Sequence, residues 1–374
     1  MQTSDTAGFV AGISAWAAVE SPTHDAAGVN RAMDLVSSEA ADASIALERI
    51  PGQDGLGDSI LLRSGPRSQD RGILVLSHLD TVHPVGTLAR DLPVRVEGDR
   101  LYGPGIYDMK GGAWLAFQAF KQVAKAGSPQ LPLTYLFTPD EEIGSPTTRR
   151  LIEDLGRQAA YVLVTEPGRD GGKVVTSRKG VGRFTVAIEG RPAHAGTRHP
   201  DGRSAIREAA HQILAIEALT DYGRGVTTNV GSVSGGTADN VVPQHCGFTV
   251  DLRVETNADG EFFSDAIRGL RPVGADVRIT VEGGMNRPPY ERSPETAALY
   301  DTARSLAREI GFELGEVPRT GGGSDGNFTA AFGIATLDGL GIDGDGAHTL
   351  AEYGLISSIE PRMRLMASLL ARLS

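Results

Sequence analysis

This sequence has little cysteine and no excess of positive charge, and each absence excludes a class of protein. The 374 residues include a single cysteine, so no disulfide can form within the chain, as expected of proteins in a reducing compartment. The formal net charge of −11 argues against nucleic acid or an anionic membrane as a main partner, since both require a basic surface. We therefore expect a cytoplasmic protein without nucleic-acid or membrane partners.

Long apolar runs are also absent. The run from Phe9 to Val19 could form the core of a signal peptide, but Asp5 precedes it and the first basic residue is Arg31, whereas signal peptides begin with positive charge. Nothing approaches the roughly 20 apolar residues of a membrane span. We predict that the run forms a first helix that ends at Ser21–Pro22.

The single cysteine, Cys246, has two possible roles. It could be a nucleophile, but a small buried hydrophobic side chain is the more common role of a lone cysteine. We expect Cys246 to be buried.

The length of the chain predicts two domains, because one compact core seldom serves so many residues. Short apolar runs at 73–76, 133–137 and 161–164 are typical of strands buried on both faces. A helical stripe at 113–126 separates the first two. This order predicts an α/β fold, with a mostly parallel sheet flanked by helices.

The pattern changes in the middle of the chain. Residues 183–189, 247–255 and 276–282 alternate between apolar and polar side chains, which indicates an antiparallel sheet with one covered face. Helical stretches at 203–218 and 259–270 lie between them, and the α/β pattern resumes with a helix at 294–310 and a strand at 334–337. We predict a catalytic domain in two parts, 1–177 and 288–374, and an inserted α+β domain at 178–287.

Acidic residues and histidines follow the predicted buried strands. His78 and Asp80 end the first strand, and later clusters supply further carboxylates and a late histidine. Ligands of open α/β sheets bind at the carboxyl ends of the strands. Imidazoles and carboxylates that meet there would suit zinc or a similar divalent ion. The candidates in these clusters are His78, Asp80, Asp108, Glu141, Glu142, Glu166 and His348.

Each of these motifs taken alone has an ordinary explanation. A His-x-Asp pair is usually a surface pair or a helix cap, and adjacent acids in a loop are usually solvated. The histidines at 24, 83, 199, 211 and 245 are expected to be structural or exposed. The order, number and shared position of the seven candidates nevertheless favour a paired-metal hydrolase.

The chain resembles a family of di-zinc metallopeptidases and deacylases. That family includes glutamate carboxypeptidase, aminoacylase, acetylornithine deacetylase and succinyl-diaminopimelate desuccinylase. The resemblance covers essentially the whole chain, and its motifs together are highly specific. The matching blocks are Ser77–Pro84, Leu101–Gly112, Thr138–Ser145, Arg191–Gly196, Asp239–Pro243 and Thr320–Gly326.

The resemblance implies a role for each metal-site candidate. Asp108 would bridge two Zn²⁺ ions, with Co²⁺ or Mn²⁺ as possible substitutes. His78 and Glu166 would complete one site, and Glu142 and His348 the other. Glu141 would be the general base, and Asp80 would orient the His78 ring. The peptide bond after Asp108 would be cis.

The resemblance also assigns roles outside the metal site. The inserted domain would be a lid through which two chains form a homodimer, and His194 would reach the partner's active site to stabilise the oxyanion. Without the resemblance, His194 would be interpreted as a surface residue of the lid. The block around Arg319 is most similar to the glutamate carboxypeptidase branch, where Arg319 would hold a substrate carboxylate, with Asn240 and Arg253 lining the same pocket. Alternatively, Arg319 pairs with Glu316 or Asp325.

These features predict an enzyme that hydrolyses the amide of an N-acyl or peptidyl amino acid with a free carboxylate. A deacylase of another small amide is an alternative. A binding protein without catalysis on the same fold is less favoured, because a binder would not need Glu141 as a base.

Overall fold

The computed structural model describes residues 5–43, 45–66, 71–127 and 129–374. The chain divides into two compact units. The first comprises residues up to Ser177 together with Arg292–Thr320 and Ser324–Ser374. The second comprises Arg178–Glu291 and Gly321–Gly323.

A six-stranded sheet forms the centre of the first unit, in the order β1-β2-β6-β3-β7-β14. β6, β3, β7 and β14 run parallel to one another, whereas β2 pairs antiparallel both with β6 and with β1 at the edge. The strands are β1 (Ala46–Ile50), β2 (Ser59–Ser64), β3 (Gly72–His78), β6 (Leu133–Thr138), β7 (Ala159–Val164) and β14 (Ala335–Leu337).

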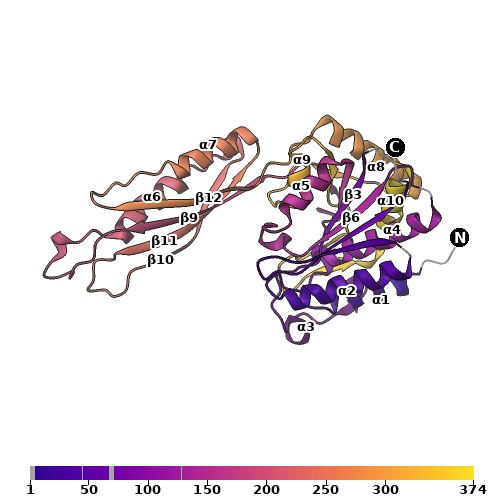
Figure 1. Ribbon diagram of the computed structural model, residues 1–374, viewed down its shortest axis with the longest axis horizontal. Coiled ribbons are helices and arrows are strands. Elements are labelled where there is room, and N and C mark those ends of the chain that lie inside the picture. Colours follow the sequence, from indigo (N-terminus) through magenta and orange to yellow (C-terminus); the bar gives the residue numbers. More distant parts are fainter. Residues whose placement is uncertain (1–4, 44, 67–70, 128) are drawn as a thin grey trace. The chain divides into compact units, whose positions relative to one another are not determined.

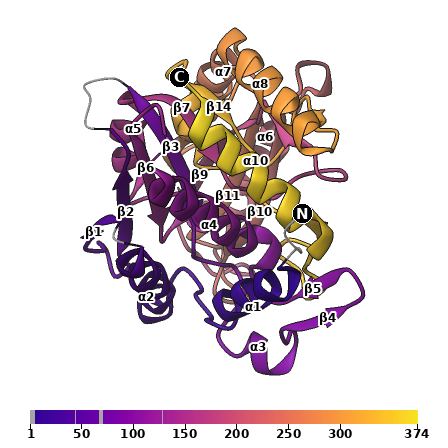
Figure 2. The same cartoon turned by 90° about the vertical axis from the view of Figure 1, so that its right-hand side faces the viewer.

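Both faces of this sheet are covered, because successive side chains of a strand point to opposite faces. In β3, Ile73 and Val75 pack into one core, and Leu74 and Leu76 pack into another. Figure 2 shows α4 and α10 crossing one face side by side. The core that contains Ile73 and Val75 also takes apolar residues from α1 (Thr6–Ala17), α2 (Ala26–Asp42), α4 (Gly111–Ala126), α8 (Pro294–Ile310) and α10 (Ile359–Arg372). The core that contains Leu74 and Leu76 takes apolar residues from α5 (Arg149–Arg157) and α9 (Gly326–Ala330).

Short strands complete the first unit. A second sheet has the order β15-β16-β5-β4, and β8 pairs with β13. The bounds are β4 (Arg95–Glu97), β5 (Arg100–Tyr102), β8 (Val174–Val175), β13 (Glu316–Val317), β15 (Gly344–Asp345) and β16 (Tyr353–Leu355), with the short helix α3 (Thr87–Arg90) before β4.

The second unit is an antiparallel sheet of the order β10-β11-β9-β12. Figure 1 shows α6 and α7 lying along the same side of this sheet. Its core contains Phe184 and Val186 of β9, which alternate with exposed residues of the same strand. The elements are β9 (Gly180–Glu189), α6 (Ala205–Glu217), β10 (Thr227–Gly235), β11 (His245–Val254), α7 (Asn257–Arg268) and β12 (Arg278–Arg287).

The α/β sheet and the separate antiparallel sheet confirm the predicted fold class. The sequence-based interpretation missed several elements, because their residues carry no strong period: β1, β2 and β10 are among them. The sequence-based prediction placed Gly321–Gly323 in the catalytic domain, whereas in the structure these glycines belong to the second unit. There Arg253 donates to the Gly321 carbonyl at 3.2 Å. Cys246 is buried, as expected. Within the described residues, no helix is both long and apolar enough to cross a membrane.

Candidate metal centre and active site

Three neighbouring parallel strands end where the predicted site residues lie. β3 ends at His78, and β6 and β7 pair on either side of it. Glu141 and Glu142 stand in a short turn after β6, and Glu166 follows β7 by two residues. Because these strands are parallel, their carboxyl ends lie at one edge of the sheet, the edge where open α/β folds bind ligands.

Asp108 lies between two histidines. It stands in the turn between β5 and α4, and the Asp108–Met109 peptide bond is cis. Its Oδ1 is 3.3 Å from Nε2 of His78, and its Oδ2 is 3.6 Å from Nε2 of His348. Each carboxylate oxygen thus faces a different imidazole, which is the arrangement that a bridging ligand needs.

The two other predicted carboxylate ligands lie beside the same histidines. Oε2 of Glu142 is 3.2 Å from Nε2 of His348, and Oε1 of Glu166 is 3.8 Å from Nε2 of His78. His78 can share a metal with Asp108 and Glu142, or with Glu141 and Glu166, since the potential ligand atoms within each group lie within 4.8 Å of one another. The structure therefore brings all the predicted ligands together in the first unit.

Asp80 is fully buried beside His78 and uses its side chain in an unexpected way. Nδ1 of His78 is 2.9 Å from the backbone oxygen of Asp80 and 3.4 Å from its Oδ1, so the carbonyl is the nearer partner. The carboxylate accepts the backbone N–H groups of Glu141 and Glu142 at 3.2 and 3.1 Å, and the hydroxyl of Thr23 at 2.7 Å. Asp80 therefore fixes both the His78 ring and the Glu141–Glu142 turn.

Negative charge dominates the electrostatics of this cluster. Burial alone would raise the pKa of Asp108, but the hydrogen bond and positive charge of His78, together with the charges of Arg169 and His348, outweigh it and lower the pKa to about 2. The hydrogen bond to Glu142 raises the pKa of His348 to about 9. Burial raises the pKa of Glu142 to about 7, although His348 opposes this effect. The carboxylates thus hold protons on the imidazoles, in the place where divalent cations could balance the charge.

The residues present fit a divalent metal. Among the described residues, the buried Oε1 of Glu142 has no hydrogen-bond partner, and such a group is costly unless something binds it. Carboxylate oxygens and imidazole nitrogens are the donors that zinc accepts in hydrolases. Of the possible groupings, the distances to the two imidazoles favour His78, Asp108 and Glu166 for one ion and Asp108, Glu142 and His348 for a second.

Glu141 is placed differently from Glu142, although the two are adjacent. Both residues are partly buried, but the Glu142 carboxylate faces His348 at 3.2 Å, whereas Glu141 groups with His78 and Glu166. A carboxylate beside the ligands is suited to exchange protons with water. Asp140, the third acid of this cluster, instead accepts hydrogen bonds from Thr147 and Thr148 and so anchors the start of α5.

The other predicted site residues lie on loops and on the second unit. Arg319 is exposed. Of the two acids that could pair with it, Glu316 accepts from Arg292 at 2.9 and 3.1 Å, and Asp325 accepts from Thr138 at 3.2 Å.

On the second unit, Arg253 donates two hydrogen bonds to Asp251, at 2.7 and 2.9 Å. His194 and Asn240 are exposed, and the Asn240 carbonyl accepts the N–H of Ala195 at 2.9 Å. Arg253 is therefore held by Asp251 and by the Gly321 carbonyl.

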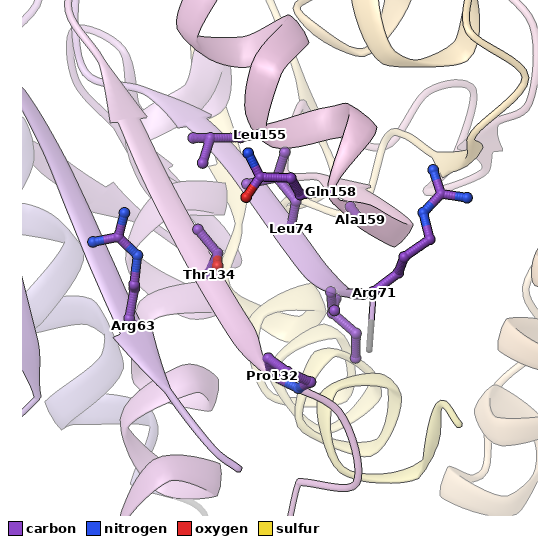
Figure 3. Close-up of a pocket in the computed structure, with 10 residues that line it drawn as sticks. Arg63, Arg71, Leu74, Pro132, Thr134, Leu155, Gln158 and Ala159 are labelled. Atoms are coloured by element: carbon purple, nitrogen blue, oxygen red, sulfur yellow. The ribbon is translucent and has the colours of Figure 1, made fainter. Parts of the chain in front are cut away.

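A surface hollow of about 540 Å³ in the first unit lies away from these residues. It is lined by Arg63, Arg71, Thr134 and Gln158 among others (Figure 3). These residues stand near the amino-terminal starts of β3, β6 and β7, at the opposite end of the strands from His78 and Glu166. The hollow has no acid or histidine in its lining and is not the candidate site.

Two buried residues that support the site were missed by the sequence-based interpretation. Thr23 donates to Asp80 from a segment far away in the chain, and a single threonine carries no signal. Glu352 accepts the backbone N–H of Asp108 at 3.0 Å. Its spacing, four residues after His348, was a signal that could have been used.

Comparison with known proteins identifies a family and several relatives that this chain is similar to. The model of peptidase family M20/M25/M40 matches residues 74–372. Carboxypeptidase G2 of Pseudomonas sp. (strain RS-16) is 33% identical over 94% of this chain and 86% of its own length. Succinyl-diaminopimelate desuccinylase of Delftia acidovorans is 28% identical over 80% of this chain and 81% of its own.

A solved structure shares the fold. The M20 family metallo-carboxypeptidase Sso-CP2 of Sulfolobus solfataricus has a TM-score of 0.77 at 16% identity, covering 97% of this chain and 98% of its own. The family match spans every predicted metal ligand from His78 to His348 and the Glu141–Glu142 turn. The chain therefore belongs to peptidase family M20/M25/M40 and is a hydrolase of peptide or amide bonds.

Proposed function

We propose that this protein is a two-zinc hydrolase that releases an amino acid with a free carboxylate from an N-acyl or peptidyl substrate. The observation that carries the proposal is the position of Asp108, whose two carboxylate oxygens face His78 and His348 at 3.3 and 3.6 Å. A pair of ions sharing one carboxylate is a typical centre for amide hydrolysis. The similarity to carboxypeptidase G2 over 94% of the chain supports this class of reaction.

Different residues of the protein have different roles in the proposed reaction. Two divalent ions, when bound, would supply Lewis acidity that polarises the amide carbonyl and makes water a better nucleophile. Glu141 takes the proton from the attacking water and passes it to the leaving nitrogen. Asp80 keeps Glu141 in place, because it accepts the Glu141 backbone N–H at 3.2 Å.

His194 is proposed to stabilise the oxyanion that forms on the substrate carbonyl. Its Nδ1 accepts the N–H groups of Gly196 and Thr197, both at 3.1 Å. Since Nδ1 is an acceptor in both bonds, the proton of the neutral ring lies on Nε2. Nε2–H is then a ready donor on an exposed side chain, which suits an oxyanion partner. We propose that the second unit is a lid and dimerisation unit and that His194 acts on the partner chain.

Arg319 is proposed to bind the carboxylate of the released amino acid. It is exposed and directly precedes Thr320 and the glycines Gly321–Gly323, whose bare backbone lets a ligand approach closely. An arginine fork matches a carboxylate geometrically. Asn240 and Arg253 are candidates for further polar contacts with the substrate.

A deacylase of small N-acyl amino acids is a second candidate. The similarity to a desuccinylase over 80% of the chain supports it, and the same centre would serve both reactions. The two candidates differ in the acyl group rather than in the amino acid that is released.

A substrate panel on the purified protein tests the proposal. The panel holds peptidyl and N-acyl amino acids, each paired with the corresponding amino acid amide, with and without added zinc. We expect hydrolysis of the acids to depend on metal and to be lost on chelation. Metal-independent turnover, or equal turnover of acids and amides, would contradict the proposal. Preference for peptidyl or acyl substrates decides between the two candidates.

A further inference from the structure

Glu352 is a buried acid, and each of its two carboxylate oxygens has two hydrogen-bond partners. It directly precedes β16, four residues after His348, and is 1% exposed. Its Oε1 accepts the backbone N–H groups of Tyr107 and Asp108 at 2.9 and 3.0 Å. Its Oε2 accepts the N–H of Gly105 at 3.0 Å and faces Nε2 of His83 at 2.7 Å.

The four partners come from two segments that also carry predicted metal ligands. Gly105, Tyr107 and Asp108 belong to the turn that presents the Asp108 carboxylate. His83 follows β3, five residues after His78. Glu352 itself is covalently joined to the loop that carries His348. One side chain therefore connects the three ligand-bearing segments around His78, Asp108 and His348.

The loop of His348 needs such an anchor. His348 has a φ of 64°, a left-handed conformation that is strained for a residue other than glycine. Local hydrogen bonds hold the turn, where the N–H and hydroxyl of Thr349 donate to the Gly346 carbonyl at 3.0 and 2.7 Å. Those bonds lie within the loop. Glu352 ties the end of this loop to the Asp108 turn through side-chain hydrogen bonds, beside the pairing of β16 with β5.

An ionised carboxylate is the side chain that matches these donors. Its two oxygens offer about four acceptor positions and no donor. Three of the surrounding groups are backbone N–H donors, and Nε2 of His83 donates to the carboxylate when it carries the ring proton. A glutamine of the same size would turn its NH₂ group toward one of its two sets of neighbours. At least one buried backbone N–H would then lose its acceptor, which displaces the segment that it belongs to.

We propose that Glu352 is a positioning residue that sets the distance between Asp108 and the two histidines, and thereby the affinity of the centre for both metal ions. This inference rests on the proposed two-metal function. Residues that hold metal ligands in place typically account for roughly 10- to 100-fold in metal affinity, and we expect a loss of this size for Glu352→Gln.

A matched control is available in the second unit. Glu208 is 2% exposed and accepts the backbone N–H groups of Val273 and Gly274 at 2.9 and 2.8 Å, together with Gln212 at 2.7 Å. It is thus an equally buried acid that holds a loop, but the loop carries no predicted ligand. Glu208→Gln measures the general cost of replacing such an acid.

The test is a zinc titration of the unmodified protein, Glu352→Gln and Glu208→Gln against a chromogenic chelator, with thermal melting of each metal-free protein. We expect two ions per chain with unchanged affinity in Glu208→Gln and weakening of both ions in Glu352→Gln. An unmodified protein that binds no zinc would overturn the proposed function. Two ions bound with equal affinity by all three proteins, or equal weakening in both variants, would overturn the role of Glu352 alone.

A second variant keeps the inference testable if Glu352→Gln does not fold. His83→Leu removes the side-chain partner of Oε2 and leaves the three backbone contacts of Glu352 in place. We expect it to weaken zinc binding at the lower end of the same range, roughly 10-fold, relative to Glu208→Gln. An affinity equal to that of the unmodified protein would overturn the inference.

Discussion

The Asp80 carboxylate accepts the backbone N–H of Glu141, with Oδ1 3.2 Å from the nitrogen. The neighbouring N–H of Glu142 donates to Oδ2 of the same side chain at 3.1 Å. Asp80 is therefore more than the partner of the His78 ring. It joins the end of β3 to the turn after β6, so that the proposed base and a proposed ligand keep their places relative to His78.

The first prediction concerns the hydrogen bonds between the Asp80 carboxylate and the Glu141–Glu142 turn. Asp80→Asn should lower kcat/KM by roughly 10- to 100-fold, because an amide cannot accept all three hydrogen bonds. Thr23→Val, of nearly the same shape, removes only the hydroxyl bond to Asp80 and should cause a smaller loss. Steady-state kinetics on both variants checks that kcat/KM falls further in Asp80→Asn than in Thr23→Val. A Thr23→Val enzyme as damaged as Asp80→Asn would show that local packing, not the carboxylate, matters here.

The adjacent glutamates should give opposite phenotypes. Glu141→Gln should keep its bound metal and lose roughly 10²- to 10⁴-fold in kcat, the range expected when a general base is removed. Glu142→Gln should instead weaken metal binding, because the buried Glu142 carboxylate faces His348 at 3.2 Å. Metal content and kcat measured on the same samples separate the two roles. The reverse pattern would mean that the roles are exchanged.

The third prediction concerns recognition of the carboxylate. We expect the bound substrate to cover Arg319, and losing one partner of a buried, charge-assisted pair costs about 2–5 kcal/mol. An amino acid amide substrate should therefore be cut roughly 30-fold to several thousand-fold more slowly than the acid. Arg319→Ala should lose a similar factor on the acid and little more on the amide.

The control for this prediction is Arg292→Ala. Arg292 is another arginine of the first unit, whose guanidinium pairs with Glu316 at 2.9 and 3.1 Å. It should leave the ratio between acid and amide substrates unchanged. Additive losses for Arg319→Ala and the amide would show that Arg319 does not contact the carboxylate.

The proposed dimer makes a fourth prediction. If His194 acts on the partner chain, an inactive Glu141→Gln chain and an inactive His194→Ala chain should restore part of the activity when they form a mixed dimer. Activity after subunit exchange, with each variant alone as the control, is the measurement. An active monomer, or no recovery after proven exchange, would contradict the role in trans.

Much of the fold could be predicted because hydrophobic periodicity is local. The runs in β3, β6 and β7 are apolar on both faces, as buried parallel strands must be. The strands β9 and β11 alternate because only one face of their sheet is covered. His78, Glu141, Glu142 and Glu166 could be predicted for a related reason, since they follow strands that the pattern had located.

The rest depends on contacts between distant residues. Thr23 and Asp80 meet across 57 positions, and Glu352 reaches Asp108 across 244, so no local pattern pairs them. The sequence indicated that Asp80 would orient His78, but not that its carboxylate would hold the Glu141–Glu142 turn. Gly321–Gly323 joins the second unit through the Arg253 contact, although the flanking chain belongs to the first.

The metal content of the purified protein tests the central claim most directly. Elemental analysis of the unmodified chain should find two divalent ions per chain, and Asp108→Asn should abolish activity and reduce the bound metal, since the carboxylate between His78 and His348 is the proposed bridge. A fully active protein that contains no metal and is insensitive to chelators would contradict the account.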